Sequence, residues 1–82
     1  MKTKEQRSIR VIAKDIRADW KNIYFGAVPY LEAMEELDKI TDNYFADDAR
    51  YVVMYFLANA GTWRGEVARR IKAELNLMLK TK

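Results

Sequence analysis

The chain has 82 residues and a net charge of +3, half of its residues are hydrophobic, and it contains neither cysteine nor histidine. This length and composition indicate one domain, residues 1–82, with enough apolar side chains for a core. Without cysteine and histidine, disulfides, thiolate metal sites and iron–sulfur clusters are excluded, and the commonest catalytic base is missing.

The charge is arranged in three blocks along the chain. Residues 1–21 carry +4, residues 22–61 carry −5, and residues 62–82 carry +4. Such blocks suggest one face for a polyanion and another for a different partner. The alternative is that the blocks attract one another in the folded chain.

The first predicted helix covers about residues 3–20 and carries two stripes whose members recur at spacings of three and four. The apolar stripe consists of Ile9, Ile12, Ala13, Ile16 and Trp20. The basic stripe consists of Lys4, Arg7, Arg10, Lys14, Arg17 and Lys21.

Residues 22–28 can be read as helix, loop or short strand. They could extend the first helix and break it at Gly26, or form a strand over 23–25, for which no partner strand is visible. Proline is best tolerated in the first turn of a helix. Pro29 therefore predicts a second helix from about residue 27 or 29 to residue 39.

Residues 41–46 are expected to form a loop, with Tyr44 and Phe45 folding back onto the core. Asp47 or Asp48 then caps a third helix that runs to about residue 59. Its residues 51–58 are apolar nearly all round, which is typical of a central helix. A buried strand would show the same run, but the acidic cap and the Gly61 exit favour the helix.

Gly61 is expected to end this helix in the left-handed conformation, and Thr62 to cap a fourth helix that runs to about residue 79. The apolar stripe of the fourth helix consists of Trp63, Val67, Ile71, Leu75 and Met78. The sequence thus predicts an all-α fold, a compact bundle of three to four helices with short loops.

The candidate nucleic-acid-binding residues are the basic stripe of the first helix together with Arg64, Arg69 and Lys72 of the fourth. Cations along one helix line recur about every 5 Å, which suits phosphates. A helix, a glycine turn and a basic helix also outline a helix-turn-helix reader. The plainer alternatives are a solvated face and an ordinary helical hairpin.

An enzyme, a cofactor and a metal are not expected. Ser8 is the only serine and has no base to activate it. The acidic residues between 32 and 48 lack the spacing of a helix–loop–helix calcium site. The longest apolar run, residues 51–58, falls far short of the ~20 residues that span a bilayer. The basic start leads into an amphipathic segment, so a cytoplasmic location without a membrane partner is the default expectation.

Two segments, residues 20–31 (WKNIYFGAVPYL) and residues 55–66 (YFLANAGTWRGE), resemble parts of small helical proteins of bacteriophages and mobile elements of Gram-positive bacteria. That group has no assigned activity, so no residue role is carried over. The resemblance implies a short accessory protein, of a kind that often binds DNA or blocks a host complex.

Two hypotheses follow for the function. The first is a non-enzymatic, nucleic-acid-associating accessory protein that uses the first and fourth helices. The alternative is a protein-binding inhibitor or adaptor that blocks a host complex, such as a nuclease defence system in the manner of an anti-CRISPR. It would use the acidic middle of the chain or exposed aromatics near Tyr24, Phe25, Tyr44 and Phe45. A homo-oligomer is a third possibility.

Overall fold

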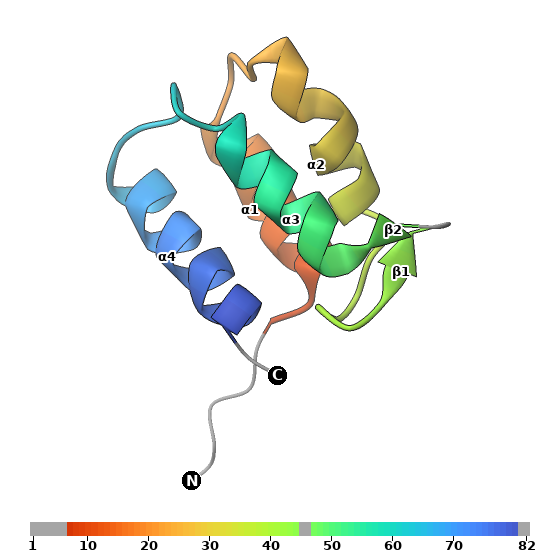
Figure 1. Ribbon diagram of the computed structural model, residues 1–82. Coiled ribbons are helices and arrows are strands. Elements are labelled where there is room, and N and C mark those ends of the chain that lie inside the picture. Colours follow the sequence, from red (N-terminus) through yellow and green to blue (C-terminus); the bar gives the residue numbers. More distant parts are fainter. Residues whose placement is uncertain (1–6, 45–46, 81–82) are drawn as a thin grey trace, which may run out of the picture.

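The computed structural model describes residues 7–44 and 47–80, and in these residues four α-helices enclose one core (Figure 1). The helices are α1 (Ile9–Asp19), α2 (Val28–Met34), α3 (Ala49–Ala58) and α4 (Glu66–Lys80). A 3-10 turn, η1 (Phe25–Ala27), precedes α2, and two short antiparallel strands, β1 (Asn43–Tyr44) and β2 (Asp47–Asp48), precede α3. The predicted all-α bundle is confirmed.

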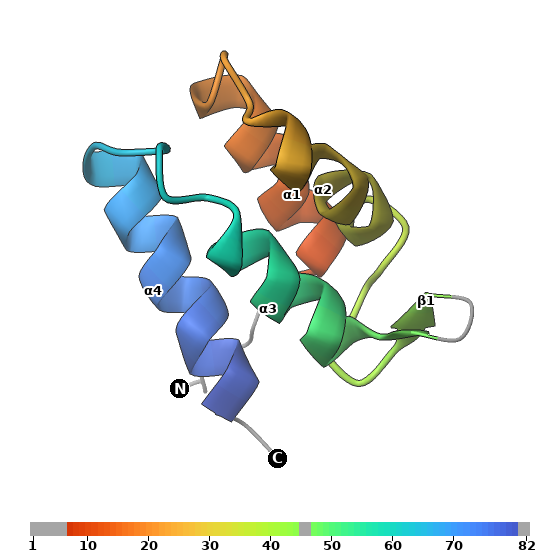
Figure 2. The ribbon, with the colours of Figure 1, turned by 45° about the horizontal axis from the view of Figure 1, so that its top comes forward.

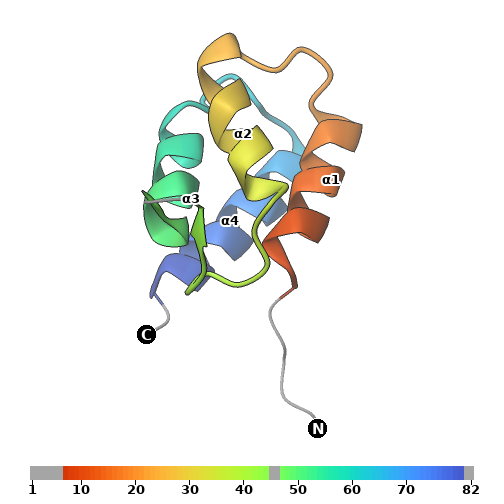
Figure 3. The ribbon, with the colours of Figure 1, turned by 90° about the vertical axis from the view of Figure 1, so that its right-hand side faces the viewer.

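The four helices form a ring in which each helix packs against two others. α2 and α4 each contact both α1 and α3, so α1 and α3 lie diagonally opposite (Figures 1 and 2). Figure 3 shows the same arrangement from the side, with α3 and α1 at the two edges of the view. Each helix therefore has one side in the core, two flanks against neighbours, and one side facing outward.

The predicted apolar stripes provide the core. Ile9, Ile12, Ala13 and Ile16 of α1 are buried completely, and Ile71 and Leu75 of the neighbouring α4 belong to the same buried cluster. Burying a large aliphatic side chain contributes about 1.5–3 kcal/mol, so these stripes decide which side of each helix turns inward.

Three aromatic rings fill the end of the core near the α3–α4 connection. Trp63 stacks on Trp20 with ring centroids 5.6 Å apart and planes 10° apart, and Phe56 meets both rings edge-on. The indole N–H of Trp63 donates to the Asp19 carboxylate at 2.8 Å. Trp63 was expected inside the fourth helix, but it lies before α4, in the segment 59–65.

α1 begins at Ile9 and not near residue 3, and α2 ends at Met34 and not at residue 39. One interaction accounts for both corrections. The backbone N–H groups of Ile9 and Arg10 donate to the carbonyls of Asp38 and Leu37 at 2.9 and 3.0 Å. Residues 37 and 38 thus satisfy the free N–H groups at the start of α1 instead of continuing α2.

The expectations for the remaining ends of the helices were partly right. Asp48 caps α3, since its carboxylate accepts from the Arg50 N–H at 3.0 Å. Residues 20–24 form a loop that leads into η1, so neither a strand nor an extension of α1 occurs there. The side chains of Tyr44 and Phe45 lie outside the description, and their predicted packing stays a prediction.

The expected roles of Gly61 and Thr62 were wrong. Gly65, not Gly61, has a positive φ, of 114°, and α4 begins directly after it at Glu66. Because Trp63 is buried in the core, the chain turns into α4 only after this residue. The residue with positive φ is therefore Gly65, four positions after Gly61. Thr62 consequently lies too early to cap α4.

These positions predict opposite outcomes for two glycine substitutions. Gly65→Ala should lower the free energy of unfolding by about 1–2 kcal/mol, because an L side chain is strained at positive φ. Gly61→Ala should be neutral or raise it by about 0.4–1 kcal/mol, because its Cβ would meet no atom within 4 Å. Urea unfolding of the two variants measures both, and equal destabilisation by the two would contradict the assignment.

Candidate nucleic-acid interface

Arg7 is occupied by contacts within the protein. Its guanidinium donates to the Asp15 carboxylate at 2.6 Å and to the two Glu74 carboxylate oxygens at 2.9 and 2.8 Å. The hydrogen bond to Glu74, and after it the hydrogen bond to Asp15, raises the pKa of Arg7. Arg7 precedes α1 and ties that end of the chain to α4, so its charge is balanced before any ligand arrives.

Arg17 is the second member of the predicted stripe that is paired. Its guanidinium donates to the carboxylate of Glu35, just past the end of α2, and this hydrogen bond raises the pKa of Arg17. The pair lies at the surface, where an ion pair contributes at most about 1 kcal/mol to stability. The pair also places the Glu35 carboxylate beside the basic stripe of α1.

Three cations of the stripe remain exposed and without a hydrogen-bond or ion-pair partner in the described part of the chain. Arg10 and Lys14 line a shallow groove of about 280 Å³ between α1 and α2, together with Val11 and Glu35. Lys21 follows the end of α1 and is also exposed. Lys4, the first member of the predicted stripe, lies outside the described residues.

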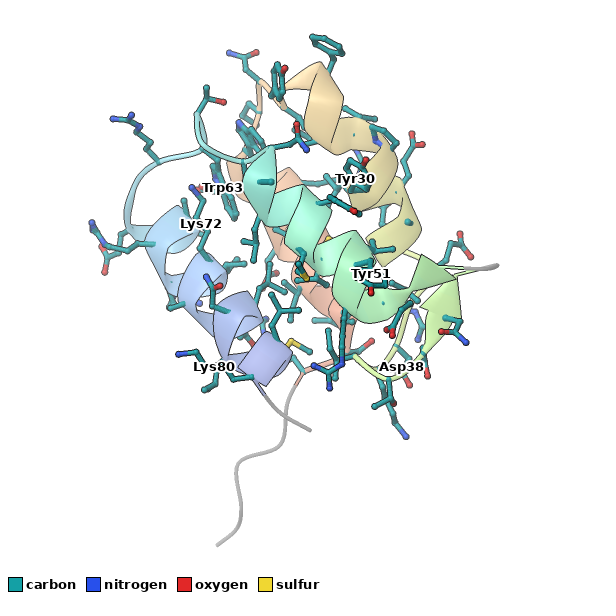
Figure 4. The ribbon with its side chains drawn as sticks, viewed as in Figure 1. Tyr30, Asp38, Tyr51, Trp63, Lys72 and Lys80 are labelled. Atoms are coloured by element: carbon teal, nitrogen blue, oxygen red, sulfur yellow. The ribbon has the colours of Figure 1, made fainter. Side chains whose placement is uncertain are left out.

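The three candidates of the fourth helix form a cationic cluster near the start of α4. Lys72 donates to the backbone carbonyl of Trp63 at 2.7 Å, and its ammonium lies 5.9 Å from the Trp63 ring centroid (Figure 4). Burial, and after it the positive charge of Arg64, lowers the pKa of Lys72. Arg69 lies one turn before Lys72 on the same side of the helix and is exposed. We call Arg64, Arg69 and Lys72 the α4 cluster.

The two basic regions do not share a face. On α1, Arg10, Lys14 and Arg17 lie on the flank toward α2, while Asp15 and Asp19 lie on the flank toward α4. On α4 the acid lies on the flank toward α1, where Glu74 binds Arg7, and Lys72 lies on the opposite flank, toward α3. The basic flank of α1 and the α4 cluster therefore lie at opposite corners of the ring of helices.

The helix-turn-helix reading does not fit the structure. Between the last residue of α3 and the first of α4 lie residues 59–65, longer than the three or four residues of that motif. The two helices run side by side in opposite directions, not at a steep angle (Figures 1 and 2). The arrangement is the ordinary helical hairpin that the sequence left open.

Sequence reasoning missed an exposed row of apolar side chains on α3. Its outward side carries Tyr51, Met54, Tyr55 and Ala58, and the first three are 54%, 47% and 52% exposed. The all-round apolar pattern of this helix was taken to mean that it is central, but one side faces outward. The sequence contained one indication of this outward side, because Tyr51 and Tyr55 are tyrosines, which tolerate water on one edge of the ring.

The acidic middle of the chain has local structural roles. The Asp42 carboxylate accepts from the backbone N–H groups of Lys39 and Asp38 at 3.0 and 3.2 Å, and the first of these bonds makes the largest contribution to lowering the pKa of Asp42. Asp48 is the α3 cap. Asp42 and Asp48 are therefore each engaged in local backbone contacts.

No family model, curated protein or solved structure matches this chain. None of the helices in the described residues is long and apolar enough to cross a membrane.

The α4 cluster predicts a measurable coupling between two of its members. Arg64→Gln should raise the pKa of Lys72, because it removes a positive charge that disfavours the protonated amine. The pKa should stay below that of a free lysine, because the burial of Lys72 persists. An NMR titration of the Lys72 side chain tests this, with Lys39→Gln as the control. An unchanged Lys72 pKa in Arg64→Gln would show that the two residues are too far apart to interact.

Proposed function

We propose that this chain is a non-enzymatic nucleic-acid-binding protein and that the α4 cluster is its main contact with the phosphate backbone. The proposal includes a cytoplasmic accessory role in a phage or mobile element, in keeping with the resemblance noted above. The observation that carries it is the grouping of the exposed Arg64, just before α4, and the exposed Arg69, in its first turns, with Lys72, whose ammonium lies over the Trp63 ring.

The charges around the cluster support the same conclusion. Of the two acids in α4, Glu74 is bound to Arg7, which leaves Glu66 as the acid on the exposed part of this helix. The basic flank of α1, in contrast, has Glu35 within its groove and Asp42 near Arg10. A polyanion that approaches α4 meets less opposing charge than one that approaches α1.

A specific observation also favours protein binding as a second candidate. Phe25 is 79% exposed, and it packs against the half-exposed ring of Tyr24 with centroids 4.9 Å apart. An exposed aromatic pair of this kind is a common anchor at protein interfaces. Both residues were among the aromatics named for the inhibitor hypothesis.

Two double variants with the same change in net charge test the main proposal. Arg64→Gln/Arg69→Gln should weaken binding to labelled DNA about tenfold or more and lower the salt slope by roughly two contacts. Arg10→Gln/Lys14→Gln, at the opposite corner, should weaken it less than about threefold, because only the long-range field changes. Fluorescence anisotropy across a series of salt concentrations measures both effects.

The comparison can fail in two distinct ways. If the α1 double variant loses as much affinity as the α4 double variant, the contact surface is not the α4 cluster. If the unmodified chain binds neither duplex nor single-stranded DNA at the lowest salt, where backbone binding is strongest, nucleic-acid binding is rejected. In that case capture of a partner that depends on Phe25 becomes the leading idea.

A further inference from the structure

The outward side of α4 is exposed along the whole length of the helix. With 15 residues, α4 is the longest of the four helices, and its exposed residues all fall on one side. Glu66, an acid, is the first of them and begins the helix. The others, which we call the outer face of α4, are Arg69, Arg70, Ala73, Asn76, Leu77 and Lys80.

The outer face has an uncharged middle with an arginine on each side. Because an α-helix turns by about 100° per residue, Ala73 and Leu77 lie between Arg69 and Arg70 when the helix is viewed along its axis. Arg70 lies toward α1, since it lines a hollow between α1 and α4. Arg69 lies toward α3, one turn before Lys72. The two guanidinium groups therefore reach out on opposite sides of the helix.

α4 can be approached by a large ligand because it forms one edge of the molecule. α1 and α3 both lie on its inner side, and α2 lies beyond them (Figures 1 and 2). The outer face is therefore turned away from the other helices over a length of about 22 Å.

We propose that the outer face of α4 enters the major groove of B-form DNA. The inference rests on the proposed function and deepens it by naming the form of nucleic acid and the groove. The major groove is about 12 Å wide, which admits one α-helix, and the phosphates of both strands border it. In this position Arg69 and Arg70 reach the two rows of phosphates, while Ala73 and Leu77 face the edges of the bases.

The uncharged middle of the outer face suits the floor of this groove. Each thymine presents a 5-methyl group there, which apolar side chains contact. Leu77 is 65% exposed, so its apolar surface is available for that contact. Ala73 is small enough to let the backbone of α4 come close to the base edges. The outer face should therefore prefer DNA that contains thymine.

The acids nearest to Arg70 are engaged within the protein. Asp15 and Asp19 of α1 line the same hollow as Arg70. Asp15 accepts hydrogen bonds from Arg7, and Asp19 accepts from the indole N–H of Trp63. These contacts weaken the opposing charge but do not remove it, so the larger share of the phosphate contact falls on the side of α4 toward α3, where the α4 cluster lies.

Other ligands with phosphate groups fit the outer face less well. A single strand has no groove for the helix, and the major groove of an RNA duplex is too deep and narrow for side chains to read. A lipid surface binds helices with a broad apolar face. Among the described residues of the outer face Leu77 is the only large apolar one, and cations surround it.

The test compares two duplexes that differ only in the thymine methyl groups. One is an A·T-rich DNA duplex of about 16 base pairs, and the other carries uracil in place of thymine, which leaves the charge and the minor-groove groups unchanged. The full, unmodified chain should bind the thymine duplex at least about threefold more tightly than the uracil duplex. It should bind an RNA duplex of the same sequence at least about fivefold more weakly. Fluorescence anisotropy at one low salt concentration measures all three affinities.

Two variants of the outer face locate the contact. Leu77→Ala should remove most of the preference for thymine over uracil. Ala73→Glu should weaken binding to both DNA duplexes about tenfold or more, because it places a carboxylate within the groove. Val11→Glu makes the same change in net charge at an exposed position of α1 and should weaken binding less than about threefold. All three positions are exposed, so urea unfolding should show nearly unchanged stability.

Three results would overturn the inference, and they differ in what they leave standing. If both DNA duplexes bind equally and Ala73→Glu behaves like Val11→Glu, while Arg64→Gln/Arg69→Gln loses binding, the major groove is wrong and the proposed function stands. Tighter binding to a single strand than to the duplex has the same meaning. If the unmodified chain binds no DNA at the lowest salt, the inference and the proposed function fail together.

Discussion

The burial of Trp63 is the contact on which the arrangement of this molecule depends. Its ring lies between Trp20 and Phe56, its indole N–H is bound by Asp19, and its carbonyl is bound by Lys72. One residue in a connecting segment thus joins α1, α3 and α4. Because Trp63 sets where the chain turns into α4, it also sets which side of α4 faces α3, and with it the position of every cation on that helix.

Ion pairs then determine how much of the positive charge is available to a ligand. In the sequence, six basic residues form an even row near the N-terminus, and the row alone suggests a polyanion site. In the folded chain Arg7 and Arg17 are held by carboxylates from other elements, and α1 keeps a smaller, interrupted set. Each pair stabilises the fold only slightly, but it removes a cation from the surface potential. The balance of available charge therefore shifts from α1, where the row is longest, to α4.

The sequence predicted those features of the fold that short-range periodicity determines. Spacings of three and four placed the helices and most of the core, and the Asp48 cap follows from local chemistry. The start of α1 could not be predicted, since its free N–H groups are satisfied by carbonyls of residues 37 and 38, distant in sequence. The sequence could not show whether Gly61 or Gly65 has the positive φ, because both glycines are local turn signals and the burial of Trp63 decides between them. The pairing of Arg7 with Glu74 required the two ends of the chain to meet.

The outward side of α3 shows why an apolar pattern and a central position are different things. In a ring of four helices every helix has an outward side, however apolar its sequence is. Side chains there are only partly removed from water, about half in the case of Tyr51, Met54 and Tyr55, so they contribute less to the core than the inward ones. Tyr51 and Tyr55 are about half exposed, and they pack on one another and on Tyr30 of α2, so they cover part of the contact between α2 and α3 while one edge of each ring stays in water.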